Sequence, residues 1–390
     1  MRAGKLKDSV KQFDEFNLSA MLKKRLQAAN FIVPTPVQAQ AIPPALEGRD
    51  ILATAQTGTG KTLSFLSPIL DKMARGGLEK PANNRGAHPV QVLILLPTRE
   101  LAMQVLAAYQ TLEPNRRAAL VVGGLAEGPQ LEAIRRGGGV LIATPGRLED
   151  YLDRKLVDLG QVQILVLDEV DRMLDMGFRP AIRRIAGLLP RERQTLCYSA
   201  TLDGQTFDVA KSYLRNPVRV EVGSTLKPAA NVKLRAFEVP SAKKQTLLEH
   251  LLQSEQGSFL VFVRTKHGAD RVADRLSRSG WKAARIHGNR SQAQRTSALR
   301  SFAEGENRVL VATDVAARGI DVSHVAHVVN FDLPKVAEDF VHRIGRTGRA
   351  ERHGVASTFA DPAERNDLQK IEKTLKIRME RFRVRETAQA

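Results

Sequence analysis

The feature that most constrains the fold is a series of short, continuous apolar runs that alternate with helical patterns. The runs are rich in Val, Ile and Leu without polar alternation, which favours parallel strands buried on both faces. The alternation of strand and helix then predicts an α/β fold. The runs form two sets: 51–53, 92–96, 120–122, 140–143, 164–167 and 195–198, then 235–239, 259–263, 283–286, 309–312 and 325–330.

A linker separates the two sets of runs. The segment 222–232, VGSTLKPAANV, contains Gly, Ser, Pro and Asn and lacks acidic residues, as linkers often do. A length of 390 residues also suggests two domains, each long enough to bury its own core. We predict an N-terminal tail at 1–12, a first domain at 13–220, a linker at 221–232, a second domain at 233–374 and a basic C-terminal tail at 375–390. The C-terminal tail is either a basic helix that lies on RNA or a solvated end.

The charge balance narrows the classes of partner. The chain has 60 Lys and Arg against 42 Asp and Glu, a formal net charge of +18. This excess favours a polyanion, most often nucleic acid, although it does not separate RNA from DNA and a merely solubilising surface is the alternative. The single cysteine, Cys197, excludes an internal disulfide framework and a cysteine-built metal site. With no apolar segment of signal-peptide or membrane-spanning length, we expect a cytoplasmic protein without a membrane partner.

A phosphate-binding loop follows the first apolar run. The segment 55–62, AQTGTGKT, lies between an expected strand and an expected helix, and it fits a P-loop with Ala at the first glycine position. Small residues let backbone amides approach phosphates, and the next helix presents its positive N-terminus to them. We expect Lys61 to reach the β- and γ-phosphates of ATP and the Thr62 hydroxyl to bind Mg²⁺. The other cofactor-binding candidates in this loop are Thr57, Gly58, Thr59 and Gly60.

An acidic pair after the run 164–167 supplies the second half of the expected ATP site. Asp168 and Glu169 follow four apolar residues, which is the pattern of a Walker B strand. We expect Asp168 to hold Mg²⁺ and Glu169 to orient and polarise the attacking water. Alone, such a pair is usually part of a solvated loop, but beside a P-loop it predicts an ATP site.

Short motifs flank the ATP-site residues along the chain. The segment FIVPTPVQ at 31–38 precedes the P-loop. Further motifs follow in order: PTRELA (97–102), GG (123–124), TPGR (144–147), SAT (199–201), VFVRTK (261–266), the pair Gln292 and Arg295, ATDVAARGID (312–321) and HRIGRTGR (342–349). In their order and spacing, from about Phe13 to about Lys373, these motifs resemble those of the DEAD-box RNA helicase family, whose Q motif the segment 31–38 matches. Many motifs in one order make a chance match negligible.

The resemblance implies two tandem RecA-like domains, each a mostly parallel sheet with helices on both faces. It implies that Gln38 reads the adenine, that Phe31 stacks on its ring, and that Asp321 meets the ribose. The catalytic residues it implies are Lys61, Asp168, Glu169, Arg346 and Arg349, the two arginines reaching the γ-phosphate. The implied RNA-binding residues are Arg99, Gly124, Thr144, Arg147, Gln292, Arg295 and Thr313, and those coupling hydrolysis to movement are Asp171, Ser199 and Thr201.

The function that the resemblance implies is that of an RNA helicase dependent on ATP and Mg²⁺. Such an enzyme hydrolyses ATP on binding RNA and remodels short duplexes by closure of two lobes, with little sequence preference because its contacts are to the backbone. We expect a monomer. An ATP-dependent RNA clamp with little unwinding and a DNA-acting motor remain as alternatives. The segment 331–350 and the short C-terminal extension most resemble the bacterial RhlE-type branch.

One residue departs from the family pattern. The family's Asp-Glu-Ala-Asp is Asp168-Glu169-Val170-Asp171 in this chain. Val170 adds two methyl groups at a crowded turn, and overpacking of this kind costs about 1–3 kcal/mol unless neighbours adjust. We therefore predict an active enzyme with altered coupling between hydrolysis and unwinding.

Overall fold

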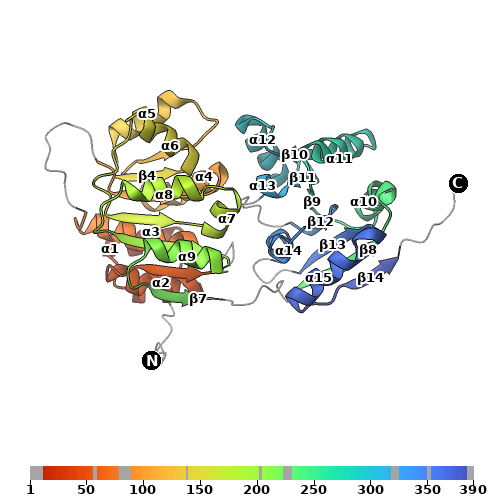
Figure 1. Ribbon diagram of the computed structural model, residues 1–390, viewed down its shortest axis with the longest axis horizontal. Coiled ribbons are helices and arrows are strands. Elements are labelled where there is room, and N and C mark those ends of the chain that lie inside the picture. The colour runs from red at the N-terminus through yellow and green to blue at the C-terminus, as the bar shows by residue number, and fades with distance from the viewer. Residues whose placement is uncertain are drawn as a thin grey trace. The chain divides into compact units, whose positions relative to one another are not determined.

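The chain divides into two compact units, Met1–Ser224 and Thr225–Ala390. The computed structural model describes residues 12–55, 59–78, 89–137, 139–201, 204–222, 231–317, 325–348 and 353–383. Each unit has its own seven-stranded sheet, and the division between the units falls within the segment predicted as a linker. Figure 1 shows both sheets with their helices.

The first unit contains a parallel sheet with the strand order β3-β4-β2-β5-β6-β1-β7. Every residue of β2, β4 and β5 is buried, as the continuous apolar runs predicted. The strands are β1 (Ile51–Thr54), β2 (Val92–Leu95), β3 (Ala118–Val121), β4 (Val140–Ala143), β5 (Ile164–Leu167), β6 (Gln194–Ser199) and β7 (Val218–Glu221).

Helices cover both faces of this sheet because successive strand residues point to opposite sides. In β1, Ile51 and Ala53 join one apolar cluster and Leu52 joins the other. One face packs against α1 (Ala20–Ala28), α2 (Pro36–Leu46), α3 (Lys61–Ala74) and α4 (Arg99–Leu112). The other packs against α5 (Glu127–Arg136), α6 (Pro145–Asp153), α7 (Val170–Asp175), α8 (Arg179–Gly187) and α9 (Gly204–Tyr213).

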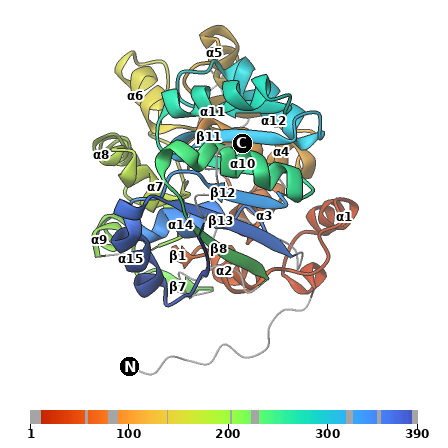
Figure 2. The ribbon, with the colours of Figure 1, turned by 90° about the vertical axis from the view of Figure 1, so that its right-hand side faces the viewer.

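The second unit repeats this architecture with the parallel strand order β10-β11-β9-β12-β13-β8-β14. Its strands are β8 (Val232–Glu238), β9 (Phe259–Val263), β10 (Ala283–Ile286), β11 (Val309–Thr313), β12 (His327–Asn330), β13 (Gly354–Ala360) and β14 (Glu380–Arg383). Helices α10 (Lys244–Ser254) and α11 (Lys266–Arg278) cover one face (Figure 2). The other face packs against α12 (Gln292–Ala303), α13 (Asp314–Ala317), α14 (Ala337–Ile344) and α15 (Arg365–Leu375).

The structure adds three strands that the sequence did not predict, namely β7, β13 and β14. The expected basic tail at 375–390 is wrong over its first part, because Leu375 ends α15, Met379 is buried, and Glu380–Arg383 pair with β8. A basic helix is therefore excluded for 380–383. Residues 384–390, like 1–11, lie outside the described residues.

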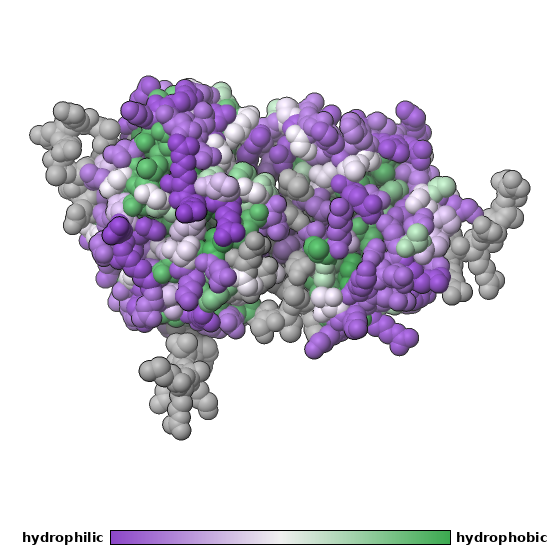
Figure 3. Space-filling view, viewed as in Figure 1, coloured by the Kyte–Doolittle hydropathy of each residue, from purple (hydrophilic) through white to green (hydrophobic). Residues whose placement is uncertain are grey.

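The surface is predominantly hydrophilic on the face drawn in Figure 3, where apolar areas are small and scattered. Among the helices in the described ranges, none is long and apolar enough to cross a membrane.

Candidate active site

The buried side-chain amide of Gln38 connects the residue before α3 to the residue before α2 by hydrogen bonds. Gln38 Oε1 accepts a hydrogen bond from the Thr35 backbone amide at 2.8 Å, and Nε2 donates to the Gly60 carbonyl at 2.9 Å. Gly60 has φ of +88°, and a Cβ added there lies 2.3 Å from Gln38 Nε2, so only glycine fits. In this arrangement Gln38 fixes the residue that precedes α3. Phe31, the other adenine candidate, is 37% exposed.

Lys61 is the first residue of α3 and its ammonium is buried. Its side chain is 6% exposed, and Nζ lies 3.9 Å from Asp168 Oδ1. Nζ has no hydrogen-bond partner among the described residues. A buried ammonium left without hydrogen bonds is costly. Its position at the N-terminus of α3 therefore fits a bound phosphate, which would supply the missing acceptors.

Two buried carboxylates follow β5. Burial raises the pKa of Asp168 to about 6, and the charge of Lys61 opposes this rise. Glu169 has φ of +53°, a region that non-glycine residues rarely adopt, and such strain is concentrated at functional sites. Glu169 Oε2 accepts a hydrogen bond from Arg172 Nη1 at 2.7 Å, and both side chains are about 5% exposed. Asp168 is thus aimed at Lys61, while Arg172 orients Glu169.

Asp171 connects this acidic turn to the end of β6. Its Oδ2 accepts hydrogen bonds from the backbone amides of Ala200 and Thr201, at 2.9 and 2.8 Å, and from Thr201 Oγ1 at 3.0 Å. The Asp171 amide donates to Ser199 Oγ at 3.3 Å. The structure therefore brings together the three residues that the sequence assigned to coupling.

Val170 is compatible with this contact. It is 1% exposed within the apolar cluster that also contains Leu167 and Met173. The hydrogen bonds of Asp171 to residues 199–201 form beside it. The larger side chain is thus accommodated in the core without breaking the Asp171 contacts.

The RNA-binding candidates of the first unit follow the neighbouring strands β2, β3 and β4. The guanidinium of Arg99, after β2, lies against Gly124, after β3, since a Cβ added at Gly124 lies 1.9 Å from Arg99 Nη1. The Thr144 amide, after β4, donates to the Val121 carbonyl at 3.0 Å. Arg147 lies 5.5 Å from the centre of the Tyr151 ring. These RNA-binding candidates therefore lie at the carboxyl edge of the sheet, beside β2, β3 and β4. The ATP-site and coupling candidates lie along the same edge: Lys61 follows β1, Asp168 follows β5 and Ser199 ends β6.

Three candidates of the second unit, Gln292, Arg295 and Thr313, follow or end strands at the carboxyl edge of its sheet. Gln292 and Arg295 lie in the first turn of α12 and are 7% and 8% exposed. Thr313 ends β11, and Arg346 follows α14 with 4% exposure. Four further candidates, Thr57, Gly58, Asp321 and Arg349, lie outside the described residues.

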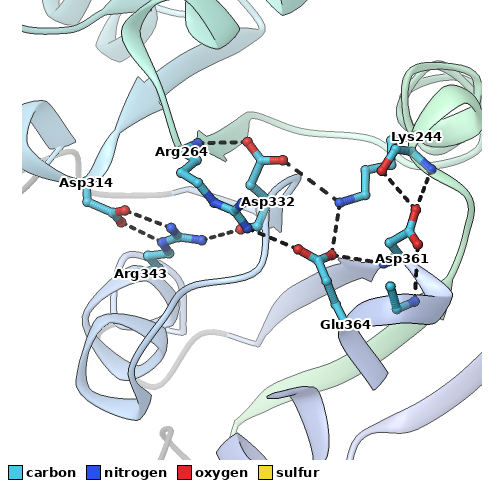
Figure 4. A network of polar contacts seen from close by, with 9 residues as sticks. Lys244, Arg264, Asp314, Asp332, Arg343, Asp361 and Glu364 are labelled. Atoms are coloured by element: carbon cyan, nitrogen blue, oxygen red, sulfur yellow. Dashed lines mark hydrogen bonds and ion pairs between the residues drawn. The ribbon is translucent and has the colours of Figure 1, made fainter. Parts of the chain in front are cut away.

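Sequence reasoning missed a buried arginine in the second unit, Arg343. Its Nε and Nη2 donate to Asp314 Oδ1 and Oδ2 at 2.6 and 2.8 Å (Figure 4). Its Nη1 donates to Asn330 Oδ1 at 3.1 Å and to the Asp332 carbonyl at 2.7 Å. Arg343 therefore fastens the end of α14 to the ends of β11 and β12. The signal was available, because Arg343 and Asp314 both lie inside motifs that the sequence matched.

A P-loop and an acidic strand end on a parallel sheet define the first unit as a P-loop nucleoside triphosphatase, and a second sheet of similar order accompanies it. The profile of the family described as DEAD/DEAH box helicase matches residues 35–209, and that of the helicase conserved C-terminal domain matches 242–351. The chain is 40% identical to the DEAD-box ATP-dependent RNA helicase CshA of Bacillus subtilis over 95% of this chain and 74% of that protein. The chain belongs to the DEAD-box ATP-dependent RNA helicase family, whose members are RNA-stimulated ATPases.

Other relatives agree with this assignment. DEAD-box ATP-dependent RNA helicase 30 of Arabidopsis thaliana is 42% identical over 90% of this chain and 59% of its own length. The structure of Dbp5 of S. cerevisiae bound to RNA and ADP BeF3 has a TM-score of 0.85 and 33% identity, with 96% of each chain covered. The expected fold of two tandem RecA-like domains is confirmed.

Proposed function

We propose that this chain is an RNA-dependent ATPase that locally unwinds or remodels short RNA duplexes. The observation that carries the proposal is the buried ammonium of Lys61 at the start of α3, which lies 3.9 Å from Asp168 and has no hydrogen-bond partner in the part of the chain that the structure describes. The known relatives support RNA as the partner, since Dbp5 is described bound to RNA together with a nucleotide analogue. We also propose that the chain acts as a cytoplasmic monomer of the RhlE-type branch.

In this proposal the residues of the first unit bind and activate ATP. Lys61 holds the β- and γ-phosphates, and Gln38 and Phe31 hold the adenine. Thr62 and Asp168 would hold Mg²⁺, whose charge would offset the negative charge that develops on the phosphates. Glu169, oriented by Arg172, accepts a hydrogen bond from the attacking water. Thr57, Gly58, Thr59 and Gly60 contribute the backbone of the loop.

The second unit completes the chemistry after closure of the two lobes. Arg346 and Arg349 then act as arginine fingers, which in related phosphate chemistry contribute about 10³–10⁵ in rate. Asp321 contacts the ribose. Because ATP and RNA each favour the closed state, each strengthens binding of the other.

RNA is held along its backbone in this proposal. The residues that hold it are Arg99, Gly124, Thr144, Arg147, Gln292, Arg295 and Thr313. Backbone contacts position a strand without reading its sequence, so affinity should depend weakly on sequence and fall steeply with salt. Closure bends the bound strand and displaces its partner.

Asp171 carries the coupling between hydrolysis and this movement. Its carboxylate joins the turn that bears Asp168 and Glu169 to residues 200 and 201. A change at the γ-phosphate can therefore reach the end of β6 through one side chain, with Ser199 and Thr201 as its partners.

A second candidate function is an ATP-dependent RNA clamp with little productive unwinding. The observation that favours it is Val170, which is buried next to Asp171 where the family has Ala. A clamp needs the same ATP and RNA contacts but dissipates the energy of hydrolysis without strand displacement.

Two assays on the full chain test these proposals together. ATP turnover is measured with matched single-stranded RNA, duplex RNA and DNA, and displacement of a labelled strand from a short RNA duplex is measured in parallel. Stimulation by RNA together with displacement supports the helicase. Fast turnover without displacement selects the clamp, and equal stimulation by DNA contradicts RNA specificity.

A further inference from the structure

The second unit buries a lysine, Lys244, that none of the matched motifs contains. Lys244 is the first residue of α10, and its side chain is 4% exposed. Both burial and the positive end of a helix disfavour a cation at this position. The carboxylates around it therefore explain its presence, as Figure 4 shows. Its Nζ lies 3.5 Å from Glu364 Oε2 and 3.9 Å from Asp332 Oδ1.

These two carboxylates also hold Arg264, which follows β9. Asp332 Oδ2 accepts a hydrogen bond from the Arg264 backbone amide at 2.8 Å. Glu364 Oε1 accepts from Arg264 Nη2 at 3.0 Å. Lys244 thus sits between two acids that fix both the main chain and the side chain of Arg264, and it offsets their repulsion.

The same aspartate connects Lys244 to α14. The Asp332 carbonyl accepts a hydrogen bond from Arg343 Nη1 at 2.7 Å, and Arg343 also binds both carboxylate oxygens of Asp314. Arg343 lies in the last turn of α14, and Arg346 follows three residues later. A shift of Asp332 therefore moves the end of α14 and the arginine that follows it.

We propose that Lys244 is a positioning residue for ATP hydrolysis: by holding Asp332 and Glu364, it sets the placement of Arg343 and Arg346 on one side and Arg264 on the other. This inference rests on the proposed function of Arg346. Lys244 acts through these residues and touches no reacting atom. Misplacement of a catalytic group by about 1 Å can lower a rate by about 100-fold. The loss of Lys244 should therefore affect ATP turnover more than nucleotide binding.

The test compares Lys244→Met with wild type and with Lys233→Met. Lys233 forms a 3.0 Å ion pair with Glu380 in the same unit, but both side chains are about half exposed. Lys233→Met therefore removes the same charge from the same unit without disturbing a buried contact. We expect Lys244→Met to lower kcat of RNA-stimulated ATP hydrolysis by about 10- to 100-fold. The KM for ATP should change less than about threefold, because Lys61 and Gln38 are untouched. Lys233→Met should behave as wild type.

Further variants separate positioning from folding. Lys244→Arg keeps the cation and should restore most of kcat. The double variant Lys244→Met/Glu364→Gln removes one of the two acids left without a cation and should fold, yet kcat should remain low because the Asp332 carboxylate then keeps only the Arg264 backbone amide and no cation. Wild-type kcat in folded Lys244→Met or in the folded double variant would overturn the proposal. Absence of RNA-stimulated hydrolysis in wild type would instead refute the proposed function itself.

Discussion

The two units bury a cation at equivalent places, the carboxyl ends of parallel strands, but they satisfy it differently. Lys61 Nζ in the first unit has no hydrogen-bond partner among the described residues. Arg343 in the second unit donates to Asp314, Asn330 and Asp332. A buried cation without hydrogen bonds is costly and is a candidate for a functional site, whereas a hydrogen-bonded one has its donors satisfied within the fold. The first unit therefore fits the proposed binding of an anion, whereas the second unit satisfies Arg343 with its own residues.

Replacement of Arg343 should give the largest change in stability. Arg343→Met leaves the partly exposed Asp314 without its cation and removes the buried hydrogen bonds of Arg343; breaking a fully buried ion pair from one side costs about 3–5 kcal/mol, which is the upper bound here. Urea denaturation with a probe in the second unit measures the loss. Arg300→Met is the control, because its pair with Glu304 is exposed and such pairs contribute under about 1 kcal/mol. An equal loss of unfolding free energy in both variants would contradict the view that the second unit satisfies Arg343 for its own stability.

Asp171→Ala tests the connection inside the first unit. It leaves the amides of Ala200 and Thr201 without their acceptor, and each unsatisfied buried group costs about 1–3 kcal/mol. Strand displacement per ATP hydrolysed should fall more than ATP hydrolysis itself. The control is Asp153→Ala, whose ion pair with Arg184 is exposed. A proportional loss of both activities would show that Asp171 has no coupling role.

Val170→Ala gives a smaller effect whose sign is informative. If Val170 is well packed, losing two methyl groups destabilises the first unit by about 1–2 kcal/mol. If it is overpacked, the variant gains stability. Its burial in the apolar cluster predicts the loss. Thermal unfolding measures the sign, and the ratio of displacement to turnover shows whether Val170 alters coupling.

The smallest effect is a pH dependence in the second unit. A hydrogen bond with His327 lowers the pKa of Glu255 to about 2, from an ordinary value of 4.5. The interaction therefore stabilises the fold above about pH 4.5 and is lost as the pH falls towards 2. The difference in unfolding temperature between wild type and Glu255→Gln should shrink over that range. A difference that stays constant down to pH 2 would contradict this assignment.

Apolar continuity predicted most of the buried strands, but it missed the interior strand β13 and the edge strands β7 and β14. β2, β4 and β5 are fully buried and stood out as Val, Ile and Leu runs. β7 and β14 are edge strands with the sequences VRVE and ERFR, whose charged residues hide the pattern. Local sequence cannot reveal them, because their pairing to β1 and β8 depends on residues far along the chain.

Motif spacing predicted the candidate site more fully than it predicted the supporting contacts. Lys61, Asp168 and Asp171 were chosen from the sequence, and the structure brings them together at one edge of the first sheet. Arg172 and Lys244 were not chosen, since each acts by orienting another residue. Only the fold shows that Arg172 binds Glu169 and that Lys244 lies beside Asp332.

The most direct test of the central claim is ATP turnover by Lys61→Ala at saturating RNA. If the Lys61 ammonium serves the γ-phosphate, turnover should fall by about 10²–10³-fold, the loss typical of removing one preorganised donor to a developing charge. The folded state should lose some stability, because Lys61→Ala leaves the buried Asp168 carboxylate without the cation that lies 3.9 Å from it. Lys211→Ala, an exposed lysine on α9 of the same unit, should leave turnover unchanged. Wild-type turnover by Lys61→Ala would contradict the account.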